Sequence, residues 1–245
     1  MKKILLIAFC AFATFAVPAQ YAPMQVGKVM TYQVKKYGDN PSTRTATSTV
    51  DSIGTADGAT VVFVTDHTDT SGTLDTEPDT HMLYRYTTAE APTTIVLMTP
   101  DEFKAQLLEM VRQQIMDAGQ MVSDADMAEI SNSMRPSGKL QLVIDPAAAD
   151  GARIPSASMR LSMNMFTMAM HLTNCKYLGK ETITVSAGEF ECAKIQYVYK
   201  FNAGTESERM NVTAWYAPGI GLVKEEDRTK QGEMISEQVL TAVSE

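Results

Sequence analysis

The sequence is poor in the residues that most often mark an active site. It contains three histidines, three cysteines and one tryptophan in 245 residues. It has no H-E-x-x-H, no G-x-S-x-G and no C-x-x-C, which excludes the common zinc-protease, α/β-hydrolase and thiol-redox motifs. We therefore expect that the protein is not an enzyme and that it binds no cofactor and no metal. A hydrolase assembled from residues far apart in the sequence stays open as a weaker alternative.

Positive charge is also scarce. The chain has 21 Lys and Arg against 29 Asp and Glu, a net charge of −8. Such a surface repels phosphate backbones, so nucleic acid is not an expected partner. Beyond the N-terminus no apolar run approaches the length of about 20 residues that a membrane-spanning helix needs. The protein is therefore not expected to span a membrane.

The N-terminus has the pattern of an export signal. Lys2 and Lys3 precede an apolar run of 14 residues at 4–17, and Ala19 ends a small-residue cleavage pattern. Residues 1–19 are therefore predicted to be a signal peptide cleaved after Ala19, leaving a periplasmic or secreted protein. The mature chain of 226 residues would carry a net charge of −10, because Lys2 and Lys3 are removed.

Export bears on the two remaining cysteines, Cys175 and Cys192. An oxidising compartment favours a disulfide between them. A hairpin turning at Ala187–Gly188 argues against it, because it places the sulfurs roughly 26 Å apart at about 3.3 Å per residue. A disulfide needs Cα atoms within about 7 Å, so the sequence leaves the pairing open. The same register places Glu181 opposite Lys194.

Most of the mature chain is predicted to be β-strand. Alternating or β-branched segments are separated by short turns such as "GDNPS", "GTADGA", "APGIG" and "TKQGE". The spacing indicates antiparallel meanders. One strand is expected in "GKVMTYQVKKYG", and "TRTATSTVDSI" and "TVVFVTDHT" form the two arms of a hairpin. Further strands are expected at 81–88, 94–98, 139–144, 158–173, 175–185, 190–201, 208–217, 221–228 and 233–243.

A helical insertion at about 99–135 interrupts the strands. Thr99, Pro100 and Glu102 form a capping pattern at its start. Apolar residues then recur at helical spacing, and "SDADMAEISNSM" predicts a second short helix. The domain prediction is therefore one domain over residues 20–245 that contains this insertion.

The segment "SMRLSMNMFTMAMHL", residues 158–172, contains five methionines. In a single strand the apolar face would switch between residues 165 and 166, which predicts a β-bulge and a bent strand. Methionine suits irregular cores and apolar binding sites. Clustered thioethers also bind Cu(I), but a switched strand divides them between two faces. Core or cavity lining is therefore preferred, and Cu(I) binding is kept as a weaker alternative.

Two motifs in the last third carry a resemblance. "KYLGKETITVSAGEFECAKIQYVYKF" and "WYAPGIGLVKEE" resemble a family of exported bacterial proteins of unknown function, sometimes labelled TapB-like. The match rests on Gly179, Glu181, Ala187, Gly188, Phe190, Cys192, Lys194 and Ile195, and on Trp215–Gly219 with Gly221–Lys224. The resemblance implies a curved sheet similar to periplasmic lipoprotein carriers, and it brings no catalytic residues.

The predicted fold is mainly β: a strongly curved antiparallel sheet, or half-barrel, with the helical insertion packed in its concave side. The predicted function is non-catalytic binding of a lipid, another apolar ligand or a lipoprotein in a methionine-lined cleft. The alternative is an envelope structural or assembly protein whose helix fills the cleft. The candidate cleft residues are Phe103, Leu107, Met110, Met163, Met165, Phe166 and Met168.

Overall fold

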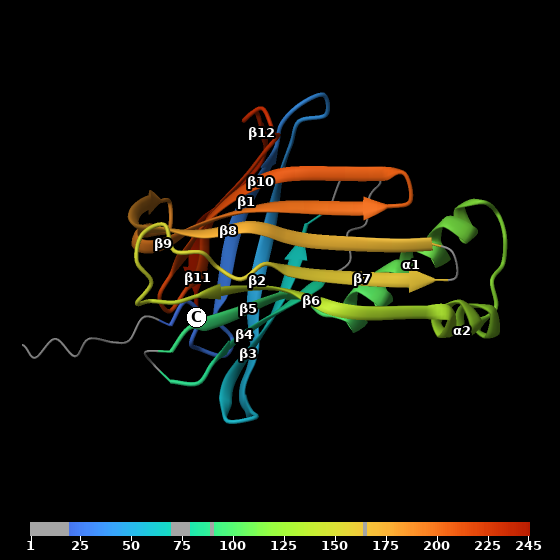
Figure 1. Cartoon of the computed structure of the whole chain (residues 1–245), viewed down its shortest axis with the longest axis horizontal. Helices are drawn as coiled ribbons and strands as arrows, with labels where there is room; N and C mark the ends of the chain where they lie inside the picture. The colour runs from blue at the N-terminus through green and yellow to red at the C-terminus, as the bar shows by residue number, and fades with distance from the viewer. Residues whose placement is uncertain (1–19, 70–78, 89–90, 164–165) are drawn as a thin grey trace, which may run out of the picture.

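The structure is a computed structural model that describes residues 20–69, 79–88, 91–163 and 166–245. The predicted signal peptide lies outside the described residues. Within them the chain forms twelve strands and two helices (Figure 1). The strands are β1 (Val29–Lys36), β2 (Ser42–Ala56), β3 (Ala59–Thr68), β4 (Thr80–Tyr86), β5 (Thr93–Met98), β6 (Met134–Ile144), β7 (Ala157–Met163), β8 (Phe166–Val185), β9 (Gly188–Ala203), β10 (Glu206–Ala217), β11 (Gly221–Arg228) and β12 (Met234–Ser244).

The strands form one closed antiparallel barrel. Each strand pairs with its neighbours in sequence, and β1 closes the barrel by pairing with β12. This last ladder runs from Val29 opposite Ser244 to Lys36 opposite Ser236. Closure satisfies the backbone groups that the two edge strands of an open sheet would leave unpaired.

The predicted half-barrel with the helical insertion packed in its concave side is therefore wrong. The sheet has no open concave side, because its first and last strands are hydrogen-bonded. The helical part is small: α1 (Pro100–Asp117) has 18 residues and α2 (Asp124–Ser133) has 10. The helices contact β6 and β7, at the end of the molecule where these strands project (Figure 1).

Local capping explains where both helices begin. The Glu102 carboxylate accepts hydrogen bonds from the backbone N–H and the hydroxyl of Thr99, both at 2.7 Å. Ser123 and Asp126 form the same reciprocal arrangement at the start of α2. Each of these reciprocal arrangements, known as a capping box, satisfies backbone N–H groups that have no partner within the helix.

The methionine segment forms a hairpin instead of one bulged strand. β7 ends at Met163, β8 begins at Phe166, and these two residues are directly paired. A chain that folds back shifts the apolar face by one residue just as a bulge does. Met159, Leu161, Met168, Met170 and Leu172 thus lie on one face and are all buried. The bulge is elsewhere in β8, between Thr173 and Lys176, where Asn174 has a φ of 55°.

The β8–β9 register also differs from the prediction. Val185 pairs with Gly188, so the turn holds two residues, and the partners of residues from Gly179 to Val185 shift by two positions. Cys192 therefore lies opposite Glu181, and Lys194 lies opposite Gly179. Lys194 still reaches the Glu181 carboxylate at 2.8 Å. Cys175 and Cys192 are both free and buried.

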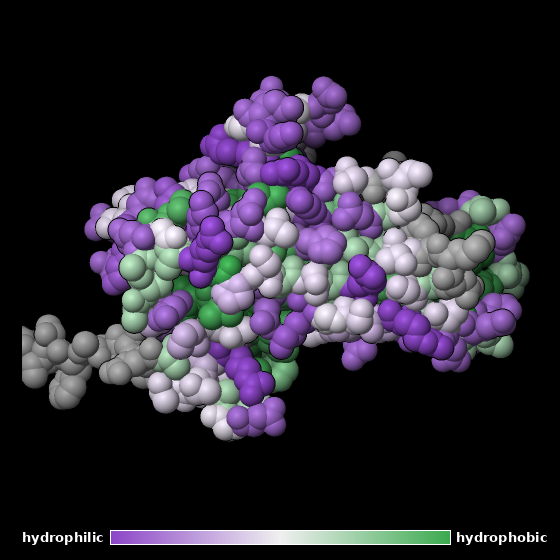
Figure 2. Space-filling view, viewed as in Figure 1, coloured by the Kyte–Doolittle hydropathy of each residue, from purple (hydrophilic) through white to green (hydrophobic). Residues whose placement is uncertain are grey.

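The chain segment after the predicted cleavage position closes one end of the core. Gln20, Tyr21 and Ala22 are buried, and the Gln20 carbonyl accepts from the N–H of Gly219 at 2.8 Å. Gly219 belongs to "APGIG", and Pro23 forms a bridge with it. This glycine-containing turn therefore holds the N-terminal segment. Hydrophilic side chains cover much of the face shown in Figure 2.

Candidate functional site

Two acidic side chains of β11 point into the barrel. Directly paired residues of antiparallel strands point to the same face, and Glu225 pairs with Ala214 while Asp227 pairs with Val212. Ala214 and Val212 belong to the buried core. Lys224, Glu226 and Arg228 point outward, as alternation requires.

These acids border a cavity of about 390 Å³, here called the lumen cavity. Its apolar lining comes from strands on opposite sides of the barrel and consists of Leu97, Met98, Leu140, Met170, Leu172, Met210 and Val212. Tyr197, Tyr199, Glu225 and Asp227 complete it. An apolar chamber with a few convergent polar groups is the usual make-up of a small-molecule site, and its volume falls within the typical range of about 300–1,000 Å³.

Burial changes the acid–base behaviour of this lining. Burial, and then the neighbouring Asp227 charge, raise the pKa of Glu225 to about 8. The Tyr197 hydroxyl donates to Glu225 at 3.3 Å, which opposes the rise. Burial also raises the pKa of Asp227, against a hydrogen bond from the Ser236 hydroxyl. At neutral pH the protonated Glu225 carboxyl can therefore both donate and accept a hydrogen bond.

A second polar group lies further round the same inner face. Gln238 pairs with Glu225 across β11 and β12. It also lines a smaller cavity of about 270 Å³ together with Ser48 and Asp66. Ser48 donates to the Asp66 carboxylate, yet burial raises the pKa of Asp66 to about 6. Polar groups therefore continue along the inner wall beyond the lumen cavity.

The structure does not gather the predicted cleft residues into one site. Phe103 and Leu107 are buried against the main core, as is Met168. Met163 is half-buried and lines a separate cavity of about 430 Å³ beside Val111 and Ile130. Met165 lies outside the described residues, and only the backbones of Met110 and Phe166 are described. A ligand-binding role for these seven residues stays a prediction.

Sequence reasoning missed Glu225 and Asp227, although "VKEEDR" contains a signal for them. Alternation from the apolar Val223 places Glu225 and Asp227 on the same face as Val223. The intervening Lys224, Glu226 and Arg228 pair with one another on the other face at 2.8 and 2.9 Å. Two acids sharing a face with an apolar valine were the available indication of an inward polar group.

The fold and this cavity define a class: a closed antiparallel β-barrel of meander topology with an apolar lumen bordered by acids. The chain belongs to the DUF3108-like family, whose model matches residues 101–240. This span runs from α1 into β12 and includes both resemblance motifs.

Two solved structures share the fold over nearly the whole chain. One is a protein of Bacteroides fragilis described as exported and as having a YmcC-like fold, with a TM-score of 0.63 and 17% identity, covering 93% of this chain and 100% of that one. The other, from Parabacteroides distasonis, is described as a lipoprotein, with a TM-score of 0.63 and 17% identity over 92% and 99% of the two chains.

At such low identity the likeness concerns the fold alone. No curated protein matches the chain. In the part of the chain that the structure describes, neither α1 nor α2 is both long enough and apolar enough to cross a membrane.

Proposed function

We propose that this protein is exported and binds an apolar small molecule in the lumen cavity without altering it chemically. The observation that carries the proposal is the apolar lining of about 390 Å³ with Glu225 and Asp227 at its border. Burying hydrocarbon against such a lining contributes about 25 cal/mol per Å². The lumen cavity, and not the predicted cleft beside α1, is now the proposed binding site.

Export is supported by three observations of different kinds. The first 19 residues have the charge and hydropathy pattern of a cleaved signal. Gln20, the first residue after the predicted cleavage position, is buried against the "APGIG" turn. The two proteins of similar fold are described as exported and as a lipoprotein. The TapB-like resemblance agrees with these observations and belongs to the same proposal.

The acids favour an apolar ligand that ends in a polar group. A carboxyl such as Glu225, with a raised pKa, hydrogen-bonds neutral hydroxyl or amide groups, and it charges only when a cation or a higher pH compensates its burial. We therefore expect a ligand with a hydrocarbon body and a hydroxyl, amide or amine end. Its body would contact the methionine and leucine side chains, among them Met170 from the methionine-rich hairpin.

One observation favours the alternative of a purely structural protein. Phe103 and Leu107 are only 5% and 9% exposed, so α1 fills the surface it packs against. That packing leaves little room for a ligand at the buried face of α1. It does not involve the described residues that line the lumen cavity, none of which belongs to α1.

A cavity-filling substitution tests the proposal. Met210 lines the lumen cavity and is partly exposed, so Met210→Trp fills the site without removing a fully buried side chain. The control is Met116→Trp, because Met116 is 57% exposed on α1. Binding of the fluorescent apolar probe N-phenyl-1-naphthylamine is measured by titration. Native mass spectrometry of the protein purified from its own cells shows whether an apolar ligand co-purifies.

We expect saturable binding of one probe molecule by the wild type and by Met116→Trp. Met210→Trp should bind at least about tenfold more weakly, since it loses about 1.4 kcal/mol or more of apolar contact. Equal binding by all three proteins, or no binding by the wild type together with an empty native mass spectrum, would refute the proposal.

A further inference from the structure

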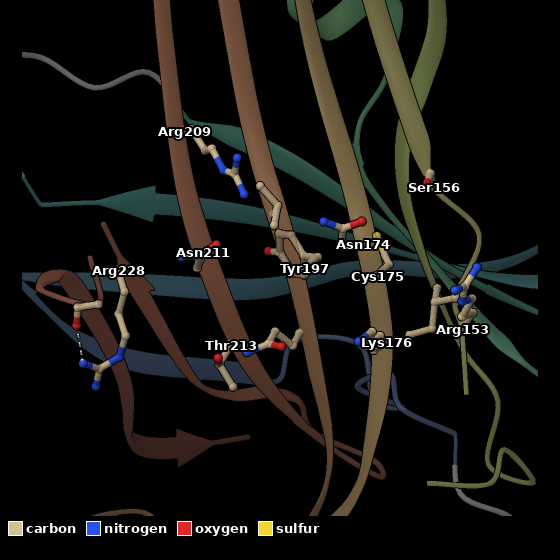
Figure 3. Close-up of a pocket in the computed structure, with 14 residues that line it drawn as sticks. Arg153, Ser156, Asn174, Cys175, Lys176, Tyr197, Arg209, Asn211, Thr213 and Arg228 are labelled. Atoms are coloured by element: carbon tan, nitrogen blue, oxygen red, sulfur yellow. Dashed lines mark hydrogen bonds between the residues drawn. The ribbon is translucent and has the colours of Figure 1, made fainter. Parts of the chain in front are cut away.

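The outer wall of the barrel carries a groove that, among the described residues, has only Tyr197 in common with the lining of the lumen cavity. A cavity of about 760 Å³ lies over β8, β9 and β10, and a neighbouring cavity of about 480 Å³ lies over the same strands. Arg209 lines both, so we treat them together as the outer groove. Figure 3 shows Arg209, Asn211 and Thr213 along one strand and Asn174 and Lys176 along another.

These residues face away from the lumen cavity. Asn211 and Thr213 alternate with Met210, Val212 and Ala214 along β10, and the latter three are packed with the core. Successive side chains of a strand point to opposite faces. The outer groove and the lumen cavity are therefore on opposite sides of the same sheet.

Basic residues form a row across three strands of the groove. His171 pairs directly with Lys200, and Lys200 pairs directly with Arg209. Adjacent strands lie about 4.8 Å apart, and like charges placed directly opposite destabilise a sheet. The Lys200–Arg209 pair is thus unfavourable for folding, and a bound anion would remove that repulsion.

More positive charge lies at the other end of the groove. Arg153, in the segment before β7, forms a backbone bridge with Lys176 of β8, and both line the larger cavity. In residues 20–69, 79–88, 91–163 and 166–245, neither of them makes an ion pair, and the same holds for Lys200 and Arg209. Four cations without a counter-charge therefore border one groove of a protein whose net charge is −8.

The remaining lining is mixed: Ile154, Cys175, Tyr197 and Val198 contribute to it, Arg228 adds a cation that pairs with Glu226 at 2.9 Å, and the rest is mostly polar and uncharged. It supplies amides and hydroxyls from Ser156, Asn174, Gln196, Asn202, Asn211 and Thr213. Among the described lining residues there is no Asp or Glu. The bulge at Asn174, whose φ is 55°, turns this amide out of the regular ladder. Amides and hydroxyls hydrogen-bond sugar hydroxyl groups, and guanidinium groups bind carboxylates and phosphates.

We propose that the outer groove binds an acidic oligosaccharide, with Arg153, Lys176, Lys200 and Arg209 contacting its carboxylates or phosphates and the amides contacting its hydroxyls. The volume of the groove is far larger than a single phosphate needs, which favours an extended ligand. The site differs from the proposed lumen site in place, charge and ligand chemistry. The failure of one proposed site would therefore not decide the other.

Calorimetric titration at low ionic strength with trigalacturonate tests this proposal, with uncharged maltotriose as the ligand of matched length. Arg209→Thr removes the residue common to both cavities, and Lys200→Thr removes its opposed neighbour. Lys35→Ala is the control, because Lys35 lies on β1, which β11 and β12 separate from the strands of the groove. Both threonine variants keep a residue suited to a strand.

The wild type and Lys35→Ala should bind trigalacturonate and not maltotriose. Arg209→Thr and Lys200→Thr should each weaken binding at least about tenfold, as expected for loss of charged hydrogen bonds. Both should also raise the thermal midpoint of the unliganded protein, because the like-charge pair is gone. Binding that survives both substitutions would overturn the proposal, as would no binding by the wild type. Equal binding of a single-stranded oligonucleotide would also overturn it, since that would show general attraction to polyanions.

Discussion

Trp215 donates its indole N–H to the Glu181 carboxylate at 2.8 Å, although 34 residues separate the two. Lys194 contacts the same carboxylate at 2.8 Å. The ammonium groups of Lys194 and Lys224 lie 5.1 and 5.4 Å from the centroid of the Trp215 ring. Four of the residues that carry the family resemblance, one each from β8, β9, β10 and β11, therefore meet in one cluster. Its evident role is to hold these four strands in register.

Trp215→Phe should destabilise the protein through this cluster. Phenylalanine retains an aromatic face but cannot donate to Glu181, so we expect a loss of about 1.5–3 kcal/mol in the free energy of unfolding. Urea denaturation at pH 7 measures it. Hydrogen bonds from Lys194 and Trp215 hold the pKa of Glu181 below its usual value. The difference between variant and wild type should therefore shrink as the pH falls through that lowered pKa. A difference that is independent of pH would contradict this account.

The comparison of sequence and structure around residue 165 shows a general ambiguity. A shift of the apolar face by one position fits a bulge within one strand and also a tight turn between two strands. The residue pattern predicts a bulge at 165 and a strand boundary at 174. The structure has a strand boundary at 163–166 and a bulge at Asn174. The local pattern was correctly identified, but side-chain alternation cannot distinguish the two geometries.

Barrel closure could not be predicted from the sequence for a related reason. The ladder that joins Val29 to Ser244 connects the first and last strands, which are more than 200 residues apart along the chain. No turn residue or spacing specifies such a long-range pairing, because its register is set only by packing of the assembled sheet. The helix starts were predictable because capping depends on residues three positions apart, such as Thr99 and Glu102. The lumen cavity depends on closure, which explains why its residues were not predicted.

Gly138→Ala should be one of the most damaging small substitutions. Gly138 has a φ of 75°, and an added Cβ would lie 2.2 Å from the Ser158 carbonyl oxygen on the paired strand. The strain and the backbone collision together should cost about 3 kcal/mol or more. The control is Gly54→Ala, because Gly54 has ordinary backbone angles and no atom within 4 Å of such a Cβ. Thermal unfolding of the two variants should separate them clearly, and similar midpoints would refute the clash.

Neither cysteine should react in the folded protein. Cys192 is fully buried and Cys175 is 2% exposed. Burial, with the nearby charges of Glu181 and Glu191, raises the pKa of Cys192 to about 12. Iodoacetamide at pH 8 should leave the native protein unmodified, whereas in urea both thiols should be alkylated without prior reduction. Mass spectrometry counts the adducts. Alkylation in urea only after reduction would show a disulfide instead.

The adjacent residues Glu225 and Glu226 should have opposite effects on stability as the pH changes. Burial raises the pKa of Glu225 to about 8, above the value of about 4.3 in an unfolded chain. Between these values the folded protein holds a proton that the unfolded chain has released. The contribution of Glu225 to the free energy of unfolding is therefore fully present below about pH 4 and is lost as the pH rises to about 8.

Glu226 points outward and behaves in the opposite way. Although burial opposes it, hydrogen bonds from Lys224 and Arg228 hold the pKa of Glu226 below its usual value. Its contribution is present above the unfolded pKa and is lost as the pH falls through the lowered value. We measure the free energy of unfolding from pH 3 to pH 9. Glu225→Gln should flatten the decline between about pH 5 and pH 8, and Glu226→Gln should reduce stability at neutral pH but not at pH 3. If the two variants gave parallel curves, Glu225 could not be a buried acid of the lumen, because alternation along β11 places only one of the two residues there.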